Sequence, residues 1–148
     1  MSNIRKMTST EGYDVLDLWM RSFTAGHPFI EDNFWQKHYD RAKESYVSEK
    51  DTYVYVRDDK IIGFISVAVD GTVKGVYVDP KFHDHGIGTE LAEFVQKEYM
   101  SLNMDIYMKN RNALKYATYH GFLIVDAYMK DEEICYRLSW SRQYCSKP

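Results

Sequence analysis

The sequence VYVDPKFHDHGIGTEL, residues 76–91, decides how the rest of this chain is interpreted. It begins as a β-strand that ends at Val78, crosses a loop that contains Pro80, and enters a helix at Gly86 and Gly88. The first turn of a helix carries unpaired backbone N–H groups and the positive end of the helix dipole. Glycine there lets a ligand come close to the backbone, so the segment predicts a site for an anion such as a pyrophosphate.

Taken alone, a short glycine motif is weak, and it favours a loop that simply begins a helix. The segment is not a Rossmann fingerprint, because it has only two glycines and follows antiparallel strands. It is not a P-loop either, because no lysine followed by serine or threonine comes after the glycines.

Upstream of this segment, residues 3–7 predict a short strand. Thr8 and Glu11 then form a capping box for a helix that ends near Gly26. A second helical region is expected over residues 32–48. Alternating apolar residues predict an antiparallel meander with strands at 52–57, 61–69 and 72–78.

Downstream, a helix is expected over residues 86–102, because Ile87, Leu91, Val95 and Tyr99 recur every four residues. A strand at 104–108, a helix at 110–120 and a last strand pair at 123–129 and 134–140 follow. This order predicts an α+β fold, a sheet with helices packed on its faces. The chain shows neither an internal repeat nor a linker, so residues 1–148 are expected to form a single domain.

The composition narrows the function classes. Hydrophobic residues make up 45% of the 148 residues and the net charge is −3 without a basic stripe, which argues against nucleic acid as a partner. Cys135 and Cys145 lie in neither metal nor redox spacing and are expected to be free thiols. There is no long apolar stretch and no signal-peptide pattern, so we expect a cytoplasmic protein that does not bind membranes.

Two signatures together resemble the GNAT superfamily of acetyltransferases. The first is its acetyl-CoA-binding motif, matched here by Val78, Pro80, Gly86, Ile87, Gly88 and Leu91. The second lies downstream at the right spacing, in Asn110, Ala113, Tyr116, Gly121 and Phe122. Residues 18–30 further resemble small single-domain bacterial members, several of which are thought to acetylate protein or small-molecule amines.

The resemblance implies a mixed, mostly antiparallel sheet that is splayed in the middle, with helices on both faces. It implies an N-acetyltransferase in which a primary amine, of a protein lysine, an N-terminus or a small molecule, attacks acetyl-CoA directly. Acetyl-CoA would be the cosubstrate and no metal would be needed.

By the same resemblance, the pantetheine arm would pair with the backbone of Val76, Tyr77 and Val78, and an N–H there would polarise the thioester carbonyl. Asn110 would contact the arm. The loop that would hold the pyrophosphate comprises His83, Asp84, His85, Gly86, Ile87, Gly88 and Thr89.

The sequence departs from the family pattern at two positions. His83 stands where the family prefers arginine or glutamine, and a zinc site with Asp84 and His85 would lack further ligands. Ala117 stands where many members carry the tyrosine that protonates the leaving thiolate. Tyr116 is the neighbouring candidate acid, although it is about 100° around the helix, and a core or sheet-facing aromatic is the favoured interpretation.

Tyr119 and His120 are weaker candidates for the acid. The general base is not identified by the sequence either. His27, Glu31 and Asp32 fall where the acceptor side should lie, but each also has an ordinary structural interpretation. Because the tyrosine common in the family is missing, a catalytically weak, regulatory acetyl-CoA-binding domain is the alternative function. An aromatic C-terminal strand with Tyr136, Trp140 and Tyr144 could form a homodimer interface or lie in the core.

Overall fold

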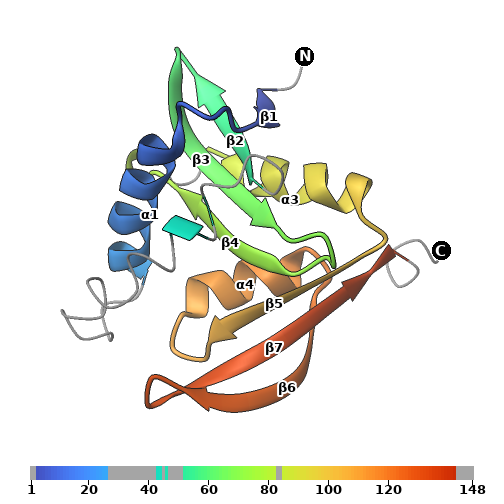
Figure 1. Cartoon of the computed structure of the whole chain (residues 1–148). Coiled ribbons are helices and arrows are strands. Elements are labelled where there is room, and N and C mark those ends of the chain that lie inside the picture. The colour runs from blue at the N-terminus through green and yellow to red at the C-terminus, as the bar shows by residue number, and fades with distance from the viewer. Residues whose placement is uncertain (1–2, 27–42, 45, 47–51, 83–84, 143–148) are drawn as a thin grey trace.

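The computed structural model describes residues 3–26, 43–44, 46, 52–82 and 85–142 of the chain. Its elements, coloured along the chain in Figure 1, are β1 (Ile4–Lys6), α1 (Gly12–Gly26), β2 (Thr52–Arg57), β3 (Lys60–Val67), β4 (Val73–Val78), a short 3-10 helix η1 (Pro80–Phe82), α3 (Ile87–Glu98), β5 (Ser101–Tyr107), α4 (Arg111–Tyr119), β6 (Leu123–Lys130) and β7 (Glu133–Ser141).

The strands form two sheets that meet at one end. Strands β1-β2-β3-β4 form an antiparallel sheet in that order, and β5-β7-β6 form the other. The sheets are joined by a parallel bridge between Thr72 and Asn103, where the Asn103 N–H donates to the Gly71 carbonyl at 2.9 Å. No further pairing joins β4 to β5, both of which are fully described, so the sheet opens beyond that bridge. The predicted mixed, splayed sheet is therefore confirmed.

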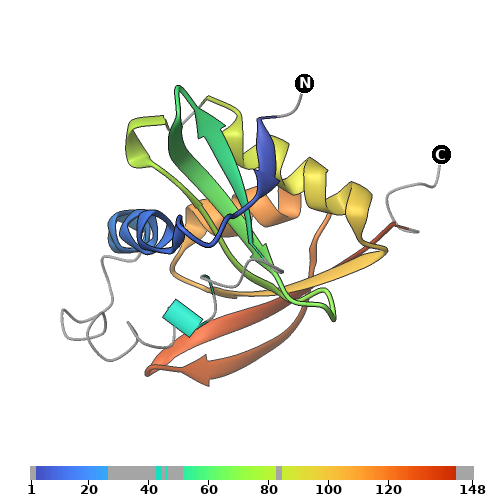
Figure 2. The same cartoon turned by 45° about the horizontal axis from the view of Figure 1, so that its top comes forward.

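Helices cover both faces of the four-stranded sheet (Figures 1 and 2). On one side, α1 buries Val15, Leu18 and Trp19 in a cluster that includes Phe64 of β3. On the other side, α3 buries residues of its predicted apolar face, among them Leu91, in a second cluster. Alternate residues of a strand point to opposite faces, so one sheet can carry both cores.

The start of α1 follows the predicted capping box in part. The Glu11 carboxylate accepts the Thr8 N–H at 2.9 Å, which satisfies a backbone donor at the helix start. Arg5 of β1 binds the same carboxylate with both terminal nitrogens, at 2.9 and 2.7 Å. Glu11 thereby joins β1 to α1, a second role that the local sequence does not reveal.

The helix predicted to reach residue 102 is wrong at its C-terminal end. Helix α3 ends at Glu98, Tyr99 is extended, and Leu102 lies in β5 opposite Trp140, fully buried. Pairing with β7 overrides the apolar spacing that would continue the helix. Of the predicted helix at 32–48, Lys43, Glu44 and Tyr46 are helical and the rest lies outside the described residues.

Two of the three C-terminal aromatic residues lie in or against the core. Trp140 is buried and packs near Phe122, and Tyr136 packs against the same core. Tyr144 lies outside the described residues.

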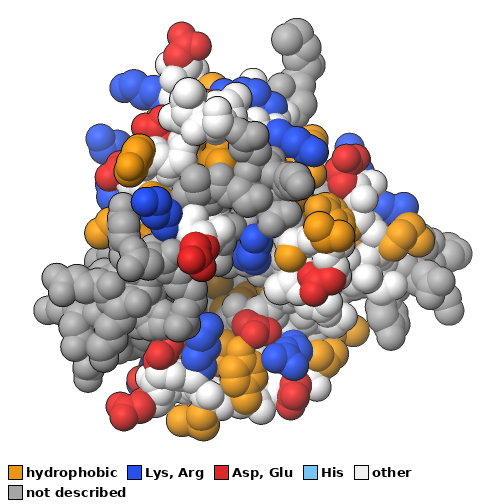
Figure 3. All heavy atoms as spheres, viewed as in Figure 1, with side chains coloured by type: hydrophobic (Ala, Val, Ile, Leu, Met, Phe, Trp, Pro, Cys, Tyr) orange, Lys and Arg blue, Asp and Glu red, His pale blue; other side chains and the backbone are white. Residues whose placement is uncertain are grey.

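On the face shown in Figure 3, basic and acidic side chains are interspersed and form no continuous basic area. Within the described part of the chain, no helix combines the length and apolar character that a membrane span requires.

Candidate active site

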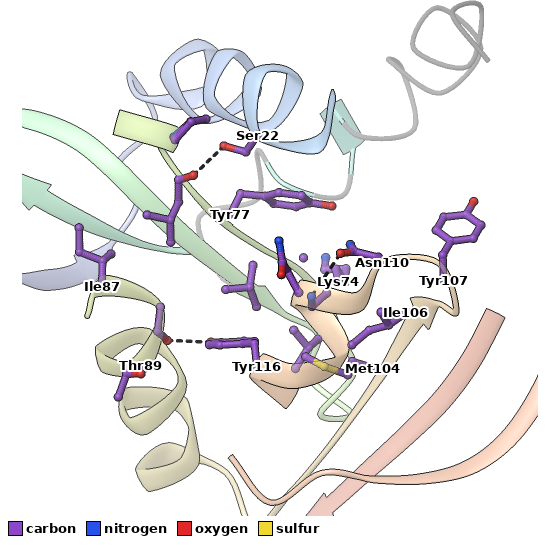
Figure 4. A pocket seen from close by; sticks show the side chains of 18 of the residues that line it. Ser22, Lys74, Tyr77, Ile87, Thr89, Met104, Ile106, Tyr107, Asn110 and Tyr116 are labelled. Carbon is purple, nitrogen blue, oxygen red and sulfur yellow. Dashed lines mark hydrogen bonds between the residues drawn. The ribbon is translucent and has the colours of Figure 1, made fainter. Parts of the chain in front are cut away.

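A cleft of about 680 Å³ occupies the opening between β4 and β5. Its walls are residues 73–78 of β4, residues 86–89 at the start of α3 and residues 104–107 of β5. Helix α4 closes another side with Asn110, Asn112, Ala113 and Tyr116 (Figure 4). The segment that the sequence singled out therefore forms two walls of one cavity.

The backbone of β4 offers hydrogen-bonding groups to this cleft. The Asp79 N–H donates to the Ile62 carbonyl of the neighbouring chain segment at 2.8 Å, so Asp79 faces β3. Hydrogen bonding alternates along an antiparallel strand, so Val78 and Val76 turn their N–H and C=O groups away from β3, toward β5. An extended ligand placed in the opening can pair with the N–H and C=O of Val76 and with the N–H of Val78, as an added strand would.

Helix α1 is fastened to the end of β4 by two side chains. The Ser22 hydroxyl donates to the Val78 carbonyl at 3.0 Å, and Arg21 donates to the Asp79 carboxylate at 2.9 Å. Burial works to raise the pKa of Asp79, but bonds from the Lys81 N–H and from Arg21 outweigh it and hold that pKa below its ordinary value. The end of β4 and the turn after it are thereby fixed on the cleft rim.

The N-terminus of α3 has the properties of an anion site. Gly86 is its N-cap in a left-handed conformation, with φ of 75°, and no side chain caps the helix. Apart from its chain neighbours, a Cβ added to Gly86 would meet no heavy atom of the described residues within 4 Å, so the described part of the chain leaves the space in front of the helix open. Twelve residues of α3 align their dipoles behind this end. Open space, unpaired N–H groups and a dipole are what a pyrophosphate requires.

Tyr116 braces this first turn from α4. Its hydroxyl donates to the Gly88 carbonyl at 2.7 Å (Figure 4), and its Cε1 lies 3.2 Å from where a Cβ on Gly88 would be. Burial raises the pKa of Tyr116, so the hydroxyl keeps its proton. The fit between ring and glycine explains why residue 88 has no side chain.

Asn110 and Ala117 stabilise α4 itself, as its N-cap and as part of its buried face. The Asn110 side-chain oxygen caps the helix by accepting the Ala113 N–H at 3.2 Å, and Asn110 also lines the cleft. Ala117 has no exposed surface and belongs to the core that includes Phe122.

The structure brings most of the predicted cofactor residues together. The cleft is lined by Val76, Tyr77, Val78, Gly86, Ile87, Gly88, Thr89 and Asn110. His85 is exposed, packs edge-on against Phe82 with ring centroids 5.7 Å apart, and does not line the cleft.

The remaining predicted site residues either lie outside the described part of the chain or are not among the residues that line the cleft. His83 and Asp84 of the loop, and His27, Glu31 and Asp32 of the acceptor side, lie outside the described residues. Tyr119 is 80% exposed, and His120 packs against the Tyr116 ring with centroids 4.9 Å apart.

Sequence analysis missed Ser22, Lys74 and Tyr107, which also line the cleft. Lys74 carried a signal, since it is a charged residue in an otherwise apolar strand, VKGVYV. Tyr107 carried no such signal, because its partner is distant in the sequence. Its hydroxyl donates at 2.6 Å to the carboxylate of Asp131, which lies in a turn far along the chain. Among the described residues, no group of three or more His, Cys, Asp or Glu side chains could hold a metal ion.

Comparison with known proteins agrees with this geometry. A model of the acetyltransferase (GNAT) family matches residues 12–122, which include α1, the cleft and α4. The chain belongs to the GNAT acetyltransferase family. Its members use acetyl-CoA as cosubstrate, and the open α3 N-terminus with the outward β4 backbone fits the pyrophosphate and arm of that molecule.

Among related proteins, this GNAT chain is similar to the peptidyl-lysine N-acetyltransferase YiaC of Escherichia coli K12. The two are 33% identical over 129 residues, which are 87% of this chain and 88% of YiaC. A YjaB protein of Salmonella typhimurium, also named peptidyl-lysine N-acetyltransferase, is 26% identical over 84% of this chain and 85% of its own length.

Solved structures share the fold at lower identity. The solution structure of apo YjaB from Escherichia coli aligns with a TM-score of 0.80 at 19% identity, over 93% of this chain and 95% of YjaB. A PaiA N-acetyltransferase from Thermoplasma acidophilum, in complex with coenzyme A, aligns with a TM-score of 0.76 at 16% identity, over 93% and 97% of the two chains.

Proposed function

We propose that this GNAT acetyltransferase transfers the acetyl group of acetyl-CoA to the side-chain amine of a lysine in a protein. The observation that carries the proposal is the similarity to YiaC, a peptidyl-lysine N-acetyltransferase, over nearly the full length of both chains. We further propose that residues 1–148 act as one domain and that the enzyme works in the cytoplasm.

In the proposed reaction the cleft positions both reactants. Backbone groups of Val76 and Val78 hold the pantetheine arm, and an N–H of this strand polarises the thioester carbonyl. The pyrophosphate lies at residues 83–89, where the N–H groups of the α3 N-terminus receive it. Asn110 contacts the arm from α4. These residues contribute mainly proximity and orientation, together with carbonyl polarisation.

The amine attacks directly in this proposal, without an acetylated enzyme intermediate. Among the described residues, Cys135 is the one cysteine; it is buried and does not line the cleft. Burial raises the pKa of the Cys135 thiol, which disfavours the nucleophilic thiolate. The nitrogen–carbon bond therefore forms as the carbon–sulfur bond of acetyl-CoA breaks.

Of the three predicted catalytic residues, we keep His27 and Glu31 as catalytic candidates and propose a positioning role for Tyr116. His27 and Glu31 are candidates to take the proton of the attacking amine on the acceptor side. Tyr116 is the candidate acid next in sequence to the family's tyrosine position, but its hydroxyl already donates to Gly88. One hydroxyl proton cannot serve both acceptors at once, so we assign Tyr116 chiefly to holding the pyrophosphate turn, and the thiolate departs without a dedicated acid.

The test is release of CoA thiol with four acceptors: a lysine peptide with a blocked N-terminus, its arginine counterpart, a lysine-free peptide with a free N-terminus, and a polyamine. The proposal expects turnover with the first alone. Turnover with only the third or fourth acceptor would replace lysine by an N-terminus or a small amine. Acetyl-CoA binding without turnover on any acceptor would instead favour a catalytically weak, regulatory acetyl-CoA-binding domain.

A further inference from the structure

Lys74 occupies an irregular position in β4. Ser66 of β3 pairs with Gly75, whereas the next residue, Val67, pairs with Val73. Lys74 is therefore the extra residue of a β-bulge and has no counterpart on β3. Bulges bend a strand and redirect a side chain, and they are frequent beside active sites.

The bulge is held in place and opens on the cleft. The Tyr46 hydroxyl donates to the Lys74 carbonyl at 2.8 Å, and Tyr46 is itself buried between α1 and the sheet. Lys74 lines the cleft and is drawn there among the lining side chains in Figure 4. It is the one lysine or arginine among the described residues that form the cleft wall.

Its place along β4 matches the reacting end of acetyl-CoA. The start of α3 lies at the level of Val78, because Gly63 pairs with Val78 and a Cβ on Gly63 would lie 3.1 Å from Ile87 Cγ2. The pantetheine arm between phosphate and sulfur has about as many chain atoms as four residues, so it reaches roughly 13 Å when extended. Four residues back from Val78 along β4 is Lys74.

We infer that Lys74 is a site of self-acetylation, modified by the acetyl-CoA bound in its own cleft. The inference rests on the proposed function, since it places the arm along β4. The Lys74 amine loses its proton to solvent and attacks the thioester carbonyl. The new amide N–C bond forms, the C–S bond breaks, and CoA leaves as a thiolate that takes up a proton.

Self-acetylation within one cleft differs from chemical acetylation of surface lysines. The amine and the thioester share one cavity, so their effective concentration is high and the rate does not depend on protein concentration. Surface lysines such as Lys97, which is exposed on α3, react only with acetyl-CoA from solution. We expect Lys74 to be labelled at least about tenfold faster than Lys97.

The experiment incubates the whole protein with acetyl-CoA that carries a deuterated acetyl group, and follows labelling by intact mass and peptide mapping. The expected result is one rapidly labelled site, Lys74, with a first-order rate that is unchanged over a hundredfold range of protein concentration. Lys74→Arg should lose this label and Lys97→Arg should keep it. Gly88→Glu, which blocks the pyrophosphate turn, should slow labelling of Lys74 to the rate of Lys97.

Label spread evenly over surface lysines, or a Lys74 rate unaffected by Gly88→Glu, would overturn the inference. The same samples are assayed for acetyl-CoA binding by thermal shift and for transfer to the lysine peptide. Binding and transfer with Lys74 unlabelled reject self-acetylation and leave the proposed function intact. Absence of binding rejects both. Ordinary acetyl already on Lys74 after purification supports the inference only if the Gly88→Glu protein lacks it.

Discussion

The hydroxyl of Tyr116 donates to the carbonyl oxygen of Gly88 at 2.7 Å, and so joins α4 to the first turn of α3. The two residues belong to the two separate family signatures, 28 positions apart in the chain. The bond fixes the carbonyl of the turn whose N–H groups face the proposed pyrophosphate site. Tyr116 can thus influence cofactor binding without touching the reacting atoms.

Tyr116→Phe tests this relationship, because it removes the hydroxyl and keeps the ring. One neutral hydrogen bond is worth about 0.5–1.5 kcal/mol, so we expect the KM for acetyl-CoA to rise about threefold to tenfold. The kcat should change by less than about threefold, as measured by steady-state thiol release. Tyr119→Phe is the matched control, since Tyr119 is 80% exposed on the same helix.

The opposite split would assign Tyr116 to chemistry. A fall in kcat of about 100-fold with an unchanged KM is what loss of a general acid produces. In that case the bond to Gly88 must exchange for one to the leaving thiolate during turnover.

Ala117→Tyr, which restores the tyrosine common in the family, should destabilise the protein and should not raise turnover. Ala117 has no exposed surface, and a tyrosine there would overpack the core at a cost of about 1–3 kcal/mol. Urea unfolding measures this change, with Ala127→Tyr on the exposed face of β6 as the control. Higher turnover at undiminished stability would contradict this prediction and show that the new tyrosine ring reaches the cleft.

The sequence predicted the elements whose signals are local. The glycine loop, the apolar face of α3 and the helix that follows Asn110 all depend on residues within a few positions of one another, and the structure has them. The C-terminal end of α3 was missed because Leu102 continues the helical spacing. In the structure Leu102 belongs to β5 because it pairs with Trp140 of β7, a strand that is distant in the sequence.

The parts of the site that could not be predicted depend on contacts between distant segments. Arg21 and Asp79 are 58 positions apart and form an ion pair at 2.9 Å. The bulge at Lys74 arises from the register between β3 and β4, which alternation alone does not specify. Such relationships follow from packing, so no local pattern indicates them.

Gly86→Glu should abolish acetyl-CoA binding while leaving the fold in place. The added side chain meets open space, but its carboxylate would stand where the phosphates belong and repel them. Gly86→Asn is the matched control: asparagine tolerates the left-handed φ of 75° and adds no charge. Thermal shift with acetyl-CoA should remain in Gly86→Asn and vanish in Gly86→Glu. An equal shift in both variants would move the phosphate site elsewhere.

Asp59→Gly should stabilise the protein by about 0.5–1 kcal/mol. Asp58 and Asp59 form the two-residue turn between β2 and β3 with φ of 52° and 63°, the left-handed region that side chains disfavour. Glycine adopts that conformation without steric cost, and a glycine at the second position suits this turn type. Urea unfolding gives the change in free energy. Lys60→Gly, one residue later in β3, is the control and should destabilise the strand instead.

The last prediction concerns the pH dependence of Glu11, which links β1 to α1. Its hydrogen bond and ion pair with Arg5, at 2.7 Å, together with bonds from Thr8, lower the pKa of Glu11 from 4.5 to about 2, against an opposing effect of burial. A carboxyl whose pKa is lower in the folded state stabilises the fold at pH values above its unfolded pKa. That contribution is lost as pH falls from about 4.5 toward 2, because the unfolded state then binds the proton first.

Glu11→Gln removes the charge and keeps the shape. Because Arg5 is partly exposed to solvent, we expect a loss of only about 1–2 kcal/mol in the free energy of unfolding at pH 7. The difference between wild type and variant should shrink steadily as pH is lowered below 4.5, in urea unfolding repeated from pH 7 to pH 3. Glu98→Gln, at the exposed end of α3 and away from Arg5, is the control for loss of one carboxylate. A constant Glu11→Gln difference across this range would mean that the charge of the carboxylate is not the source of the difference.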